Sequence, residues 1–245
     1  MYTLTIANQK GGIGKTTSAA AISQGLTAAG YRVLCVDADP QKNLTNLLQA
    51  EPGPSVIDVI QGMPVKEAIQ QTPISGALLP SEKALASPRL KITPSTFQQI
   101  LMPLQRSYDI AIIDTMPALG PLTVSAIMAS DGLLVPVKAD RFSLSGLQEL
   151  YASVTAIKPQ LKIVGIVVTQ FNGRASLHQD VLAALEEQAR IYNTSVILPP
   201  VSATISAERW QYSGNIYKPK STASKDYQEI VNQLIKILKL KKRSK

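Results

Sequence analysis

The sequence has a single cysteine, few aromatic residues and no long uninterrupted apolar run. Cys35 is the one cysteine among 245 residues, so one chain supplies neither a disulfide nor a cysteine-ligated metal site. No apolar stretch approaches the ~20 residues that span a bilayer, and no charged-then-apolar leader precedes the first predicted strand. We therefore expect a soluble protein of the reducing cytoplasm.

Basic residues are in excess. The 25 Lys and Arg against 17 Asp and Glu give a formal net charge of +8, which favours polyanionic partners such as nucleic acid or anionic membrane, although only weakly. Hydrophobic residues make up 45% of the chain, which is enough to bury a full core. We expect one domain over residues 1–245 rather than two smaller ones.

Short runs rich in Val, Ile and Leu alternate with helical stretches along the chain. Strands are predicted at residues 2–8, 31–39, 75–81, 108–114, 132–138, 161–169 and 194–199. Helices are predicted at residues 16–30, 95–106, 121–129, 143–157, 176–191 and 223–240, with two more at 55–61 and 64–71. Near-continuous apolar strands indicate burial on both faces. The predicted fold class is therefore α/β, with a mostly parallel twisted sheet between helices.

The segment NQKGGIGKTT, residues 8–17, joins the first predicted strand to the first predicted helix. It fits the phosphate-binding pattern G-x-x-x-x-G-K-[ST] only in part, because Gln9 stands where the first glycine belongs. In such loops backbone N–H groups surround a phosphate, a lysine (here Lys15, expected to be exposed) neutralises its charge, and a hydroxyl (Thr16) binds Mg²⁺. The residues expected to bind nucleotide here are Lys10, Gly11, Gly12, Ile13, Gly14, Lys15, Thr16 and Thr17.

Three aspartates end neighbouring predicted strands. Asp37 and Asp39 lie in VDADPQ, and Asp114 ends YDIAIID. In a parallel sheet all three reach the carboxyl edge, beside the glycine-rich loop. Asp114 is expected to hold Mg²⁺ through water, with Asp37 and Thr16 as further metal candidates. A helix cap or turn residue is the alternative role for Asp37.

Three motifs, KGGIGKTT, DADPQKNLT and IIDTMPALG, together resemble the ParA branch of the ParA/MinD family of deviant Walker-A ATPases. Weaker similarity follows in LLVPVKADRFSLSGL and GIVVTQFNGR, so the resemblance covers nearly the whole chain. It implies a P-loop ATPase that binds ATP and Mg²⁺ and hydrolyses ATP slowly, stimulated by a partner. The family pattern DTPP is replaced here by DTMP, which leaves the metal site in place but puts the switch segment 114–120 in doubt.

The resemblance also explains the second lysine of the loop. In that family two subunits form a homodimer with ATP sandwiched between them. The extra lysine, here Lys10, crosses the dimer interface and contacts the nucleotide of the other subunit, whereas Lys15 contacts the nucleotide of its own subunit. Asp39 resembles the residue that positions the attacking water, and Gly11 the glycine at the dimer seam. The catalytic candidates are thus Lys10, Lys15 and Asp39, and an ordinary solvated lysine is the alternative for Lys10.

The adenine contacts are less well marked. Relatives often carry I-P-R-N where this chain has SVILPPVSATIS, so only Pro199 fits that pattern. Asn172 and Pro199 are the candidates for lining the base, and a plain turn role is the alternative for each.

Members of the family segregate DNA, mark the division site at a membrane, or serve metabolic and metallocluster enzymes. A cluster like that of the nitrogenase iron protein needs two cysteines per subunit, so we do not expect one here. The C-terminal segment KDYQEIVNQLIKILKLKKRSK suits either a membrane-binding amphipathic helix or a final helix packed on the core. Because DADPQ resembles the segregation branch, we expect plasmid or chromosome partitioning, with membrane placement or another cargo as alternatives.

DNA binding is expected to be non-specific and salt-dependent, because no helix-turn-helix domain is expected before the first strand. The basic candidates for phosphate contacts are Lys218, Lys220, Lys225, Lys241, Lys242 and Arg243, and a solvated basic face is the alternative for each. The implied partners are a second copy of the chain, DNA and a centromere-binding ParB-type adaptor, with no membrane. A nucleoid-associated location in the cytoplasm follows. An ATP-driven dimerisation switch with negligible turnover is the non-enzymatic alternative.

Overall fold

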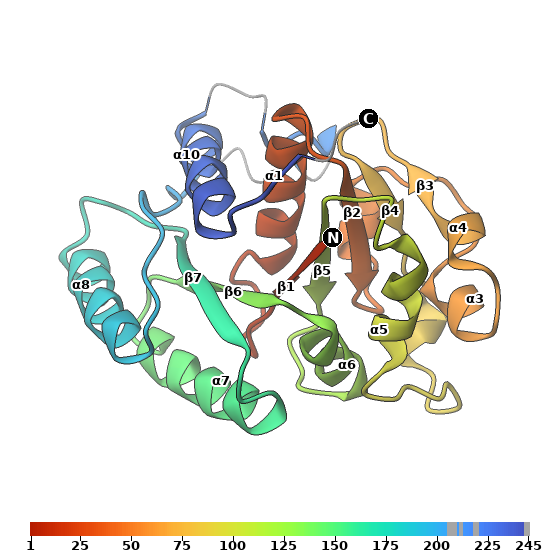
Figure 1. Cartoon of the computed structure of the whole chain (residues 1–245). Helices are drawn as coiled ribbons and strands as arrows, with labels where there is room; N and C mark the ends of the chain where they lie inside the picture. The colour runs from red at the N-terminus through yellow and green to blue at the C-terminus, as the bar shows by residue number, and fades with distance from the viewer. Residues whose placement is uncertain (205–209, 211–212, 218–220, 243–245) are drawn as a thin grey trace.

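The computed structural model describes residues 1–204, 210, 213–217 and 221–242 (Figure 1). A 7-stranded sheet has the order β3-β4-β2-β5-β1-β6-β7. The strands are β1 Tyr2–Ile6, β2 Val33–Ala38, β3 Gln70–Gln71, β4 Ala77–Leu79, β5 Ile110–Thr115, β6 Gly132–Lys138 and β7 Lys162–Thr169. Every neighbouring pair is parallel except β3 with β4. The predicted fold class is confirmed.

Helices cover both faces of the sheet. The described helices are α1 Lys15–Ala28, α2 Asn43–Leu47, α3 Val56–Ile60, α4 Val65–Ala68, α5 Thr96–Leu101, α6 Pro121–Ala129, α7 Ser143–Ile157, α8 Ser176–Ile191 and α10 Thr222–Ile237, with short 3₁₀ turns η1 Lys83–Ala86 and η2 Met102–Leu104. Successive side chains of a strand point to opposite faces. In β5, Ile112 therefore packs in the core under α1 and α10, whereas Ile113 packs in the core formed with α5 and α6.

Three predicted elements differ from the structure, and one helix was missed. Residues 194–199 form no strand and make only a single parallel bridge, between Val196 and Ile166. The helix predicted at 64–71 ends at Ala68, because the next residues pair with β4 as β3. The helix predicted at 95–106 ends at Leu101 and continues as η2, which contains Pro103, a residue without an N–H to continue the ladder. Helix α2 was not predicted at all.

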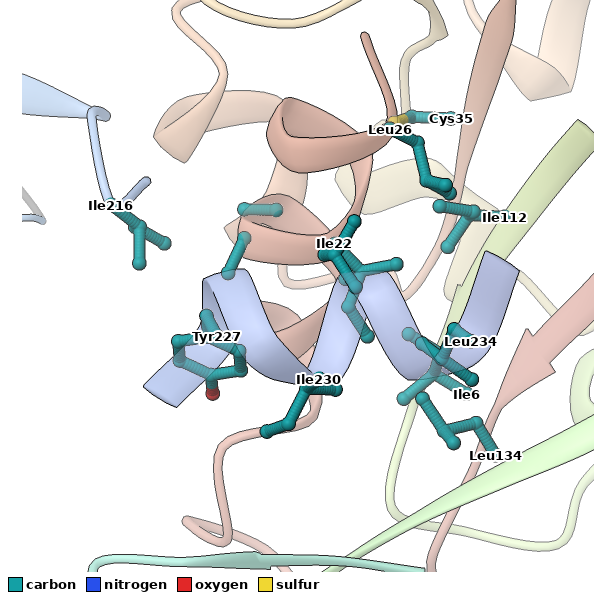
Figure 2. Close-up of a cluster of buried hydrophobic side chains, with 14 of the residues drawn as sticks. Ile6, Ile22, Leu26, Cys35, Ile112, Leu134, Ile216, Tyr227, Ile230 and Leu234 are labelled. Atoms are coloured by element: carbon teal, nitrogen blue, oxygen red, sulfur yellow. The ribbon is translucent and has the colours of Figure 1, made fainter. Parts of the chain in front are cut away.

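The last helix packs on the core through its apolar face. Tyr227, Ile230 and Leu234 of α10 are buried, and Figure 2 shows them beside Ile22 of α1. Gly25 permits the close approach of the two helices, since a Cβ there would lie 2.7 Å from a methyl group of Val231. No helix in the described ranges has both the length and the apolar character needed to cross a membrane.

Candidate nucleotide site

The glycine-rich loop runs from β1 into α1 at the carboxyl edge of the sheet. Gly12 and Gly14 have φ values of 69° and 84°, a left-handed backbone conformation that residues other than glycine rarely adopt. Two residues at the end of β7 hold the loop: the Thr169 hydroxyl donates to the Ile13 carbonyl at 2.8 Å, and the Gln170 amide donates to the Gly12 carbonyl at 2.7 Å. The loop conformation is therefore fixed by the protein itself.

Lys15 is buried, contrary to the expectation of an exposed loop lysine. Its side chain is only 7% exposed, and its ammonium donates to the Lys10 carbonyl at 3.0 Å. Burial lowers the pKa of Lys15, while Asp114 and Asp39 act in the opposite direction. A buried cation at the start of a helix, beside a glycine-rich loop, is an arrangement that binds phosphate.

Asp114 is fully buried at the end of β5, next to Asp37 in the register of the sheet. Burial raises the pKa of Asp114 well above its usual range, and the nearby Asp37 carboxylate adds to the rise; Thr16 and Lys15 offset part of it. Neither oxygen of Asp114 accepts a well-formed hydrogen bond from the residues that the structure describes. A buried carboxylate with free lone pairs fits a role as an acceptor for a metal ion or for the water bound to it.

Asp37 is engaged within the protein. One carboxylate oxygen accepts the Asp39 N–H at 3.1 Å, and the other accepts the N–H and the hydroxyl of Thr45 at 2.8 and 2.7 Å. Burial raises the pKa of Asp37 to about 6, although these hydrogen bonds act against the rise. The metal role of Asp37 stays a prediction, because this carboxylate already anchors the start of α2.

Asp39 borders an open cavity of about 560 Å³ above the glycine-rich loop. The cavity is lined by Gly12, Gly14, Lys15, Thr16, Thr17, Asp39, Asn43, Asn46, Leu47, Pro117 and Gln170. The structure thus brings together the predicted residues from the loop and from the end of β2. Asn43, Asn46 and Leu47 were missed because α2 was not predicted, and Gln170 because nothing in the local pattern links it to the loop.

The two predicted adenine contacts are not among the residues that line this cavity. Asn172 caps a turn, where its side-chain oxygen accepts the Arg174 N–H at 3.0 Å, and Pro199 is half-buried. Their contact with a base stays a prediction. Among described residues, no group of three His, Cys, Asp or Glu side chains is placed to hold a metal. A metal here needs hydroxyl, water and phosphate ligands as well, which is the usual pattern for Mg²⁺.

Lys10 points away from the cavity. Its ammonium lies 2.5 Å from a carboxylate oxygen of Asp140 and 5.4 Å from the centre of the Phe142 ring, and its side chain is 39% exposed. Gly11 is exposed, and a Cβ added there would meet only Pro117, at 3.9 Å. Lys10 is thus held by an ion pair within its own subunit, whereas Gly11 has no close contact that a Cβ would disturb.

The basic DNA candidates are only partly described. Lys225 is exposed on α10, and Lys241 and Lys242 are exposed after it. Lys218, Lys220 and Arg243 lie outside the described residues.

Comparison with known proteins gives a consistent family. Residues 1–164 match the family described as AAA domain. The chromosome-partitioning ATPase Soj of Thermus thermophilus is 36% identical over 189 residues, which cover 74% of each chain. A structure titled cobyrinic acid a,c-diamide synthase from Mycobacterium smegmatis, with bound ADP and magnesium, is 30% identical, covers 97% of this chain and 95% of its own, and has a TM-score of 0.83.

Fold similarity extends further. The ATP complex of a Cyanothece McdA variant covers 100% of this chain and 99% of its own, with a TM-score of 0.84 at 24% identity. The ADP and the magnesium of the mycobacterial structure agree with the nucleotide and the metal expected from the loop. The chain therefore belongs to the AAA domain family and, as the three motifs predicted, is a ParA-type ATPase of the ParA/MinD group.

Proposed function

We propose that this ATPase partitions DNA: ATP with Mg²⁺ joins two copies, the dimer binds DNA without sequence preference, and hydrolysis stimulated by a ParB-type adaptor releases it. The observation that carries the proposal is the different position of the two loop lysines. Lys15 is buried at the phosphate cavity, whereas Lys10 is outside it and half-exposed. Lys15 binds the nucleotide of its own subunit, and Lys10, once released from its ion pair with Asp140, binds the nucleotide of a second subunit.

Within one subunit, the residues present fit a magnesium nucleotide. Lys15 and the backbone N–H groups of the loop bind phosphate oxygens, and the Thr16 hydroxyl and Asp114 hold the metal and its water. An Mg²⁺ ion held there by Thr16 and Asp114 would supply positive charge to the phosphates. Asp39, at the rim of the same cavity, orients the attacking water.

The position of Lys10 outside its own cavity supports the proposed dimerisation. A cation that reaches the phosphates of the partner subunit makes nucleotide binding and association stabilise each other. Gly11 supports the same interface, since its own subunit leaves open space around it. Hydrolysis then removes the shared charge and lets the subunits separate.

The packing of α10 favours DNA over membrane. An interfacial amphipathic helix must keep its apolar face free for the lipid. Here Tyr227, Ile230 and Leu234 are buried against the core (Figure 2), so these apolar side chains are not exposed to contact lipid. The exposed part of the segment is basic, with Lys225, Lys241 and Lys242, which suits a phosphate backbone.

An amide-forming activity, as in the name of the mycobacterial relative, is less well supported by this chain. A cysteine nucleophile for such chemistry would have to be accessible and ionised. Cys35 is fully buried in β2, and burial raises the pKa of its thiol to about 11, so it is neither accessible nor ionised at neutral pH.

Binding to arbitrary duplex DNA at several salt concentrations tests the proposal. Affinity should need ATP and should fall steeply with salt, and Lys225→Ala should reduce the slope of log K against log salt by about 0.9 if it contacts one phosphate. Lys66→Ala, which removes an exposed charge on α4, is the matched control and should leave the slope unchanged. ATP-dependent binding to anionic vesicles but not to duplex would instead favour membrane placement.

A further inference from the structure

We infer that Ser81 and Thr45 are positioning residues for hydrolysis, because they fix the backbone of Asp39 through a closed ring of buried hydrogen bonds. Ser81 follows β4, Thr45 lies in α2, and Asp37 and Asp39 lie at the end of β2. The inference rests on the proposed role of Asp39 in orienting water. It adds two residues that have no contact with the nucleotide cavity.

The ring has four members. The Ser81 hydroxyl donates to the Asp39 carbonyl at 2.8 Å, and the Ser81 N–H donates to the Thr45 hydroxyl oxygen at 2.9 Å. That hydroxyl donates in turn to Asp37 at 2.7 Å, and Asp37 accepts the Asp39 N–H at 3.1 Å, which closes the circle. All four residues are buried, so water competes poorly for these hydrogen bonds.

The ring holds the main chain of Asp39 on both sides of its Cα, through its N–H and its carbonyl. The Asp39 carboxylate is not part of the ring. Only one carboxylate oxygen of Asp39 accepts a hydrogen bond from a described residue, the Gln41 N–H at 2.9 Å. The second oxygen is available at the cavity rim. A fixed Cα with a free acceptor oxygen is the geometry that aims a water molecule, and an error of about 1 Å in such an arrangement can reduce the rate by ~10²-fold.

Loss of the Ser81 hydroxyl should loosen Asp39 without disrupting the fold. The Asp39 carbonyl also accepts the Lys42 N–H at 3.0 Å, so Ser81→Ala leaves no buried acceptor without a partner. A second link joins the same two segments, because the Lys42 ammonium lies 2.5 Å from a carboxylate oxygen of Glu82. The substitution therefore removes one restraint on Asp39 and keeps the surrounding structure.

The test compares Ser81→Ala with Ser75→Ala. Ser75 lies before β4, is also buried, and donates to the Ser23 hydroxyl at 2.8 Å, far from Asp39 along the strand. We expect Ser81→Ala to lower kcat about tenfold or more, with nucleotide affinity, KM and ATP-driven dimerisation within twofold of the parent. Ser75→Ala should keep the parent kcat. Thr45→Ser, which retains the hydroxyl, should retain more of kcat than the isosteric Thr45→Val.

The outcomes separate this inference from the function on which it rests. A Ser81→Ala protein with the kcat of Ser75→Ala overturns the positioning role, and so does a parallel loss of nucleotide affinity, which indicates a general structural defect. Asp39→Ala is assayed alongside. If Asp39→Ala hydrolyses ATP as fast as the parent, the proposed role of Asp39 fails, whatever Ser81→Ala does.

Discussion

The Lys10 ammonium lies 2.5 Å from the Asp140 carboxylate, on the loop after β6, rather than at the phosphate cavity beside its own backbone. Burial acts to raise the pKa of Asp140, but hydrogen bonds from the Lys10 ammonium and the Phe142 N–H lower it overall, so the carboxylate is ionised at neutral pH. A lysine that reaches the nucleotide of another subunit must first leave this partner. If Lys10 binds the partner's nucleotide as proposed, Asp140 competes with dimerisation.

Asp140→Asn should release Lys10 and favour the ATP-bound dimer. Half-exposed ion pairs contribute up to about 1 kcal/mol each, and one is broken in each subunit when the dimer forms. The protein concentration needed for ATP-driven association should therefore fall by up to about 30-fold. Analytical ultracentrifugation with ATP measures this change. Asp180→Asn, an exposed carboxylate on α8, is the control for net charge and should not alter association. Weaker dimerisation of Asp140→Asn would mean that Asp140 orients Lys10 rather than restrains it.

Lys10→Ala and Asp39→Ala should have opposite effects on the dimer. Lys10→Ala keeps nucleotide binding through Lys15 but loses the contact across the interface, so ATP no longer drives association. Asp39→Ala keeps association and loses the group that orients water, which typically costs ~10²-fold or more in rate, so the dimer persists. Light scattering after ATP addition distinguishes the two. If Lys10→Ala dimerises on ATP like the parent, Lys10 has no role across the interface and is an ordinary solvated lysine.

Lys15→Ala should abolish nucleotide binding while the fold survives. The ammonium is buried and its pKa is lowered mainly by burial, so its removal relieves a desolvation cost as well as a phosphate contact. We expect a melting temperature equal to or above that of the nucleotide-free parent, with no stabilisation on adding ATP and Mg²⁺. Calorimetric ATP affinity equal to that of the parent would contradict the assignment.

The nucleotide-free protein should become less stable as pH rises from about 4 to beyond 6. Burial raises the pKa of Asp114 and Asp37 above the ~3.9 of an unfolded aspartate, to about 6 for Asp37. The protonated forms are favoured in the folded state, so their contribution is fully present below the unfolded pKa and is lost as pH rises through the folded values.

Asp114→Asn should flatten this pH dependence and stabilise the nucleotide-free protein at neutral pH, because an amide carries no charge to desolvate. It should also abolish the extra stabilisation that Mg²⁺ gives beyond ATP alone. Thermal melts at several pH values, with Asp180→Asn as the control, measure both effects. A pH profile of Asp114→Asn that overlays the parent would show that Asp114 is already ionised in the folded protein.

Local sequence was sufficient for much of the fold and for the centre of the site. The apolar runs at β1, β2, β5, β6 and β7 predicted the parallel sheet, since a strand buried on both faces has few polar residues. The glycine spacing and Lys15 predicted the phosphate loop, because that geometry forms within ten residues. Asp114 followed from the rule that parallel strands end on one edge.

Contacts between distant segments were decided only by the tertiary structure. Residues 194–199 have the composition of a strand, yet they make a single bridge to Ile166, and β3 forms only because Gln70 and Gln71 lie beside β4. Residues far apart in the chain also bury Lys15 and pair Lys10 with Asp140. They likewise form the ring of hydrogen bonds through Ser81. Hydrogen bonds and ion pairs of this kind leave no periodic pattern, because they join side chains whose proximity is set by the packing of the whole sheet and its helices.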